Sequence, residues 1–248
     1  MATPLSIQLY TLRDQIAADR DGSLARLAEI GYRSVEAYDP TADPAGFRRT
    51  ADALGISVSS THAYALFSKD AGQVFDAVAE IGTDLAIIPG GIAHDEFTTP
   101  DGLRRTADLL NGFADRAAER GIRIGYHNHW WELEPRFEDR TALEVLAGLL
   151  DPRVFLEVDT YWAQVGGADV PALLRALGDR VLALHVKDGP GVKDEPHTAV
   201  GKGAIDVPSI LAAAPDALRI VELDSCATDV FDAVAESHAY LTALEGRS

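Results

Sequence analysis

Residues 154–187 read VFLEVDTYWAQVGGADVPALLRALGDRVLALHVK and contain the unit from which the fold can be predicted. Its two ends, Val154–Trp162 and Val181–Lys187, are rich in β-branched and large apolar residues and are predicted to be strands. Between them, Val170–Leu177 has helical periodicity, and Gly178 follows as a helix-ending residue. A helix between two buried strands indicates parallel pairing with a crossover helix.

The same alternation runs along the whole chain. The predicted strands are Leu5–Tyr10, Ser34–Tyr38, Ser57–Tyr64, Leu85–Pro89, Arg123–His129, Val154–Trp162, Val181–Lys187 and Leu218–Leu223. The predicted helices are Ser23–Ile30, Pro44–Leu54, Ala71–Ile81, Pro100–Arg120, Thr141–Leu150, Val170–Leu177, Val207–Ala214 and Asp229–Leu244. Eight strand–helix pairs in 248 residues predict an α/β protein with a single (β/α)8 TIM barrel over residues 1–248. An open doubly wound sheet is the alternative, but no glycine-rich nucleotide fingerprint follows any predicted strand.

Composition and charge exclude several partners. The chain carries 22 Lys and Arg against 39 Asp and Glu, a net charge of −17, with no basic run to bind nucleic acid or an anionic membrane. Cys226 is the single cysteine, so no intrachain disulfide can form. We see no secretory signal and no apolar run of the ~20 residues that a membrane span needs. These features predict a cytoplasmic location.

Polar residues cluster at the predicted strand ends, where the active sites of such barrels lie. The main ones are Gln8, Tyr10, Glu36, His62, His127, His129, Glu132, Glu157, Asp159, His185, Lys187 and Glu222. Any one of them could simply hydrogen-bond a loop. Together they favour a site, because burying several charged groups is costly unless a metal or substrate compensates them.

Asp159, His185 and Glu222 form the sharpest subset, because they end three successive predicted strands. Carboxylate and imidazole ligands without thiolate suit one divalent ion such as Mn²⁺, Mg²⁺, Co²⁺ or Zn²⁺. Such an ion acts as a Lewis acid towards a carbonyl or hydroxyl oxygen.

At these residues the chain resembles the sugar phosphate isomerase/epimerase family of xylose-isomerase-like TIM barrels. The resemblance covers nearly the whole chain. Its motifs are Gln8-Leu9-Tyr10-Thr11-Leu12-Arg13-Asp14, Gly125-Tyr126-His127-Asn128-His129, Asp159-Thr160-Tyr161-Trp162, His185-Val186-Lys187-Asp188, Gly201-Lys202-Gly203-Ala204-Ile205-Asp206 and Val221-Glu222-Leu223-Asp224.

The resemblance implies one divalent ion held by four side chains. In the ketose epimerases these are Glu, Asp, His and Glu, and Asp159, His185 and Glu222 match the last three. His127 stands where those epimerases have the first Glu. Either His127 is a ligand, or Glu132 supplies the missing carboxylate. We slightly favour Glu132, because it restores the ligand charge.

The epimerases use two glutamates as paired acid and base, so the resemblance implies catalytic roles for Glu222 and, opposite it, His127. The leading hypothesis is a metal-dependent isomerase or epimerase of a ketose or related keto-polyol. Related proteins with a histidine-rich fifth strand resemble dehydratases of keto-inositols and lyases of keto-sugars. Those reactions also begin with removal of a proton next to a carbonyl, so they are the alternative.

A small-molecule sugar or polyol is the expected partner. The candidate substrate-binding residues are Glu36, His62, His129, Trp162, Lys187 and Lys202, although loop capping, loop packing or plain solvation would also account for several of them. Exposed loop aromatics make a homodimer plausible.

Two further hypotheses rank lower. The same barrel family includes apurinic endonucleases, but Pro89 and Trp162 stand where two of their metal-binding histidines would be expected. A non-catalytic sugar-binding protein is disfavoured by the three metal-type residues.

Overall fold

The computed structural model describes residues 5–246. Within them, eight parallel strands close into a barrel in the order β1-β10-β9-β8-β5-β4-β3-β2, and β1 pairs with both β2 and β10. This closure confirms the predicted barrel and excludes an open sheet. The predicted single domain over 1–248 also includes residues 1–4 and 247–248, which lie outside the described part of the chain.

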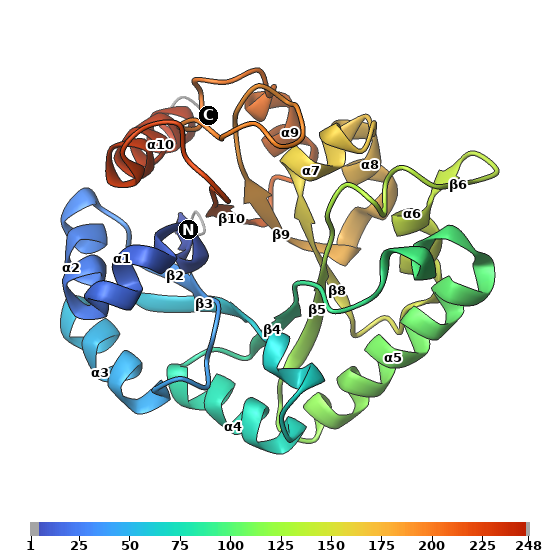
Figure 1. The fold of residues 1–248 in the computed structure, drawn as a ribbon, viewed down its shortest axis with the longest axis horizontal. Coiled ribbons are helices and arrows are strands. Elements are labelled where there is room, and N and C mark those ends of the chain that lie inside the picture. Colours follow the sequence, from blue (N-terminus) through green and yellow to red (C-terminus); the bar gives the residue numbers. More distant parts are fainter. Residues whose placement is uncertain (1–4, 247–248) are drawn as a thin grey trace.

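Helices surround the strands on the outside of the barrel (Figure 1). The barrel strands are β1 Ser6–Gln8, β2 Ser34–Ala37, β3 Ser57–His62, β4 Leu85–Ile88, β5 Arg123–His127, β8 Phe155–Asp159, β9 Val181–Val186 and β10 Leu218–Val221. The α-helices are α1 Arg13–Ala18, α2 Arg20–Ile30, α3 Pro44–Leu54, α4 Ala71–Ile81, α5 Pro100–Ala118, α6 Ala142–Leu149, α7 Thr160–Val165, α8 Val170–Leu177, α9 Val207–Ala213 and α10 Val230–Glu245. A short hairpin, β6 Arg136–Phe137 and β7 Arg140–Thr141, precedes α6.

Capping residues explain why most helix ends were predictable. In α3, Pro44 occupies the first turn, and the Asp43 side chain accepts the backbone N–H of Gly46. Gly55 ends this helix with φ of +67°, a left-handed conformation that glycine adopts without strain. Gly82 ends α4 in the same way.

The prediction was wrong after the sixth barrel strand. We expected one strand over Val154–Trp162, but β8 ends at Asp159 and α7 begins at Thr160. Asp159 Oδ1 accepts the backbone N–H of Trp162 at 2.8 Å, so a residue at the strand end also caps a helix. Helix α1 and the β6–β7 hairpin were not predicted.

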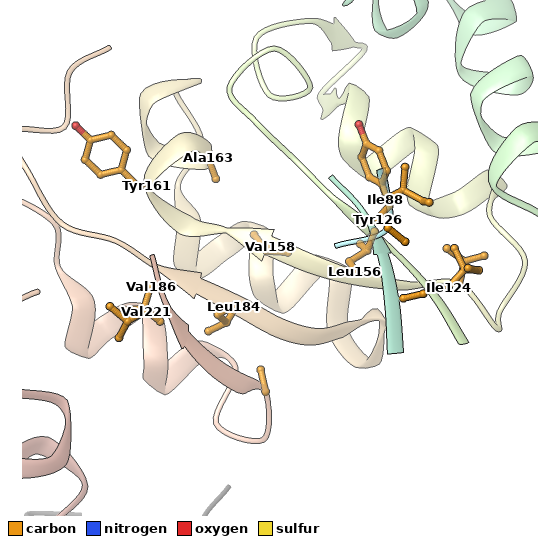
Figure 2. Close-up of a cluster of buried hydrophobic side chains, with 14 of the residues drawn as sticks. Ile88, Ile124, Tyr126, Leu156, Val158, Tyr161, Ala163, Leu184, Val186 and Val221 are labelled. Carbon is orange, nitrogen blue, oxygen red and sulfur yellow. The ribbon is translucent and has the colours of Figure 1, made fainter. Parts of the chain in front are cut away.

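The two faces of the strands belong to two separate apolar regions. Outward-facing residues such as Leu156 and Val158 of β8 join the main core beneath the helices (Figure 2). Phe155 points the other way and packs with Leu85 and Ile87 of β4 in a second, smaller cluster inside the barrel. Apolar side chains therefore pack the N-terminal end of the barrel interior around β4 and β8. No helix within residues 5–246 combines the length and apolar character needed to cross a membrane.

Candidate metal centre and active site

A pocket of about 460 Å³ opens at the barrel end formed by the C-terminal ends of the strands, which we call the mouth. It is lined by Tyr10, Tyr38, His62, Tyr64, Pro89, His127, His129, Trp162, Lys187, Glu222 and Asp224. This volume is typical of a small-molecule site.

Four side chains beneath this pocket converge on one point. His127, Asp159, His185 and Glu222 are buried, and each offers a ligand atom within 4.8 Å of the others. They end β5, β8 and β9 or follow β10, so neighbouring parallel strands place them at the same level. The buried Asp159 Oδ2 has the Lys187 ammonium, 2.8 Å away, as its partner. Two imidazoles and two carboxylates without a thiolate form a donor set that suits a divalent cation.

For each of the two histidines, hydrogen bonds show which ring nitrogen faces the point where the four side chains converge. His127 Nδ1 lies 3.0 Å from Glu157 Oε2, and its Nε2 lies 3.8 Å from Asp159 Oδ2. His185 Nε2 lies 2.6 Å from Glu36 Oε1, and its Nδ1 lies 2.6 Å from Glu222 Oε2. Metal-binding histidines commonly donate their other ring N–H to a carboxylate in this way. His127 Nε2 and His185 Nδ1 are therefore the ring nitrogens left to face an ion.

The residues present thus fit a divalent ion of the predicted type. Burial alone would lower the pKa of His185, but the carboxylates of Glu157, Glu222 and Glu36 outweigh it and hold that pKa well above its usual range. A divalent ion bound at His185 Nδ1 would take the place of a proton at that atom.

Glu157 was placed at a strand end by the sequence but was given no role in the site. It is fully buried, and its Oε2 accepts from His127 Nδ1 and from His62 Nε2, at 3.0 and 2.9 Å. The neighbouring histidines hold the pKa of Glu157 well below its usual range against the opposing effect of burial. Because side chains alternate along a strand, the pattern Phe155, Glu157, Asp159 already placed this carboxylate on the interior face.

Lys187 is a buried internal cation. Its Nζ lies 2.8 Å from Asp159 Oδ2, 2.7 Å from Glu222 Oε2 and 2.8 Å from Asp224 Oδ2. Burial opposes its charge, but these carboxylates hold the pKa of Lys187 well above its usual range. The sequence placed Lys187 in the site and Asp224 at the end of the last motif, but it did not show that the two would pair.

Glu132 lies outside the converging group, whereas His127 lies within it. Glu132 Oε1 accepts from the Tyr126 hydroxyl at 2.6 Å, and Oε2 accepts from the backbone N–H of His129 at 2.9 Å. Both oxygens are thus occupied in fixing the segment after β5. Burial raises the pKa of this carboxyl to about 7. We therefore replace Glu132 by His127 in the proposed ligand set.

The remaining candidate residues fall into two groups. His62, His129 and Trp162 line the pocket, whereas Glu36 lies beneath it and binds His185, Gln8 and Ser60. His129 stacks on Trp131 with ring centroids 4.1 Å apart, and burial lowers its pKa to about 2. Lys202 is different: its side chain is 64% exposed and its Nζ lies 3.9 Å from Glu236, away from the pocket lining.

The long segment after β9 is held firmly against the barrel. The buried Asp188 carboxylate accepts backbone N–H groups from Gly189, Gly201, Gly203 and Ile205. A Cβ on Gly203 would lie 2.1 Å from Asp188 Oδ1, so only glycine allows this approach. This anchoring explains why position 203 needs a glycine.

The fold and the four converging side chains define a barrel with a candidate divalent-metal site at its mouth. A family model described as xylose isomerase-like TIM barrel matches residues 24–218. The chain belongs to this family, which is an enzyme superfamily.

Two curated relatives are dehydratases. The chain is 27% identical over 194 residues to a 3-dehydroshikimate dehydratase of Pseudomonas aeruginosa, a match over 67% of this chain and 28% of that protein. It is 30% identical over 194 residues to an inosose dehydratase of Geobacillus kaustophilus, over 68% of this chain and 62% of that protein. The match therefore spans less than two thirds of either relative.

A solved structure from Parabacteroides distasonis, a sugar phosphate isomerase/epimerase, shares the fold. It aligns with a TM-score of 0.80 at 23% identity, over 98% of this chain and 94% of that one. This likeness supports the barrel architecture.

Proposed function

We propose that this protein is a divalent-metal-dependent dehydratase of a cyclic keto-polyol. The observation that carries the proposal is the convergence of His127 Nε2, Asp159, His185 Nδ1 and Glu222 beneath a pocket that Glu222 itself lines. Similarity to an inosose dehydratase favours loss of water over the isomerase or epimerase chemistry that the sequence first suggested.

The four converging side chains would hold the ion. When bound, it would polarise the substrate carbonyl as a Lewis acid and so acidify the neighbouring C–H. Glu36 and Glu157 orient the two histidine ligands through their outer ring nitrogens.

Two residues at the pocket floor can move the protons. His185 and Lys187 hold the pKa of Glu222 well below its usual range despite burial, so its carboxylate is ionised and can accept a proton from carbon. As the C–H bond breaks and a C=C bond forms, the C–O bond breaks, and Lys187 Nζ–H can donate a proton to the departing hydroxyl, which leaves as water. Glu222 then holds the proton taken from carbon, and its 2.7 Å contact with Lys187 allows that proton to pass to Lys187, which restores both groups. The proton balance closes within this pair.

An isomerase or epimerase remains a second candidate because His62 also lines the pocket and donates to Glu157. A second group able to exchange a proton with substrate is therefore present. Both reactions share removal of the proton next to the carbonyl.

The test begins with chelator-stripped protein reloaded separately with Mn²⁺, Co²⁺, Zn²⁺ or Mg²⁺. Each sample is incubated with an inosose and with a panel of ketoses in D₂O, and products are followed by NMR and mass spectrometry. We expect metal-dependent exchange of the proton next to the carbonyl, followed by loss of one water. A stereoisomer of unchanged mass would support the second candidate, and absence of exchange with every substrate and ion would refute both.

A further inference from the structure

The pocket has an unusual charge balance for a site in a family with sugar phosphate members. Among the described residues that line it, Lys187 is the one Lys or Arg, and its ammonium is already bound by three carboxylates. Glu222 and Asp224 line the same pocket as anions. No Lys or Arg of the described lining is therefore free to bind a negatively charged group of a substrate.

Buried carboxyl groups beneath the pocket lining add further negative charge to the site. The carboxyl groups in or under the pocket are Glu36, Glu157, Asp159, Glu222 and Asp224. These five carboxyl groups outnumber Lys187, the one Lys or Arg of the described pocket lining. An anionic substrate would enter this field without a counter-charge.

Cations of the segments around the mouth are engaged elsewhere. The Arg13 guanidinium donates to the backbone carbonyls of Tyr10 and Asp224 and lies over the Tyr10 ring at 4.5 Å. Lys193 Nζ lies 4.3 Å from the centre of the Trp130 ring. Lys202, which the sequence suggested as a substrate contact, has its Nζ 3.9 Å from Glu236 Oε2. None of the three lines the pocket.

Aromatic side chains dominate the rim instead. Tyr10 and Tyr64 are 41% and 57% exposed, and with Tyr38 and Trp162 they line the pocket. Aromatic faces suit the C–H surface of a ring, whereas hydroxyl groups on that ring can meet the polar atoms of the floor.

We propose that the pocket selects an uncharged cyclic polyhydroxy ketone and discriminates against substrates that carry a phosphate or carboxylate. The identity of the substrate as a cyclic ketone rests on the proposed function. The preference for an uncharged substrate rests on the charges of the pocket lining. It distinguishes the neutral inosose from the anionic 3-dehydroshikimate, the compounds for which the two curated relatives are named.

The kinetic test compares matched neutral and anionic substrates with the Mn²⁺-loaded protein. We expect kcat/KM for an inosose to exceed that for 3-dehydroshikimate, and that for a free ketose to exceed that for its phosphate, by at least a hundredfold. Equal or greater turnover of the anionic member would overturn the specificity and leave the dehydratase proposal standing.

A binding experiment tests the charge preference separately from the proposed dehydratase activity. Calorimetry with myo-inositol and with an inositol monophosphate measures charge preference without any reaction. If no substrate is turned over but the neutral ring binds at least tenfold more tightly, the dehydratase proposal fails and the charge preference stands. Tighter binding of the inositol monophosphate than of myo-inositol would overturn the proposed charge preference.

A charge added at the rim should shift this preference. Tyr64→Arg places a cation on an exposed position, and Tyr64→Gln removes the same ring without adding charge. Relative to Tyr64→Gln, Tyr64→Arg should raise the ratio of anionic to neutral kcat/KM, or of the corresponding affinities, by tenfold or more. An unchanged ratio would show that lining charge does not set the specificity.

Discussion

The interior face of strand β8 joins two contrasting regions of the barrel. At the N-terminal end, Phe155 packs with Leu85 and Ile87 in a closed apolar cluster. Two and four residues further on, Glu157 and Asp159 enter a network of buried carboxylates and histidines. The first region stabilises the fold, whereas the second keeps like charges together at a cost that a cation would relieve. The comparison implies that the two regions can be damaged separately.

The largest effect should come from the charged region. Asp159→Asn removes a proposed ligand but keeps a side chain able to cap α7. We expect activity to fall roughly a thousandfold or more, about 4 kcal/mol. Thermal stability without metal should stay close to that of the parent, because Glu222 and Asp224 still pair with Lys187 when the Asp159 contact is lost. Metal titration and thermal unfolding measure the two effects. Asp169→Asn, the same change at the exposed cap of α8, is the control and should leave both unchanged.

A substitution in the apolar region should lower stability and leave metal binding intact. Phe155→Ala opens a cavity beside Gly125, where the Phe155 ring leaves no room for a Cβ. We expect unfolding free energy to fall by about 3–4 kcal/mol, with metal affinity unchanged within threefold. Phe155→Leu should cost less. Loss of metal binding in the folded Phe155→Ala protein would show that the two regions are coupled.

Glu132 is a buried carboxyl group that lies next to the charged region but outside it, and its raised pKa predicts how stability depends on pH. A pKa raised from 4.5 to about 7 means that the folded state holds this proton more tightly than the unfolded state. The stability it contributes is present below pH 4.5 and is lost as pH rises towards 7, by up to about 3 kcal/mol. Denaturant unfolding at pH 5 and pH 8 should show this decline in the parent and not in Glu132→Gln. The exposed Glu134→Gln should keep it; identical pH profiles for all three proteins would refute the assignment.

The smallest effect concerns orientation of a ligand. Glu157→Gln keeps the size of the side chain but weakens its hold on His127 Nδ1–H. We expect metal affinity to fall 10- to 100-fold, about 1.4–2.7 kcal/mol, with less loss of activity at saturating metal than in Asp159→Asn. Competition with a chelator measures the affinity. The exposed Glu236→Gln is the control, and an unchanged affinity in Glu157→Gln would remove Glu157 from the positioning role.

Local signals account for the parts that could be predicted. Prolines after capping residues and glycines after apolar runs fixed the limits of α3, α4 and α8 closely. Period-two alternation and strand ends brought Asp159, His185 and Glu222 to one level, as proposed from the sequence.

Contacts across the barrel could not be predicted in the same way. Glu36 meets His185 although 149 residues separate them, and Asp224 meets Lys187 only because β9 and β10 are neighbours. Glu132 seemed the better ligand on charge alone, but its hydrogen bonds to Tyr126 and His129 depend on the path of the chain after β5. Sequence spacing does not determine that path.

The four backbone N–H groups gathered by Asp188 have a kinetic consequence. A segment tied at Gly189, Gly201, Gly203 and Ile205 would have to break these bonds together before it could swing over the pocket. Substrate would therefore enter an open mouth between Tyr10 and Tyr64 without waiting for this segment to move. For a reaction that expels water, this open path would also let the second product diffuse away as soon as it forms.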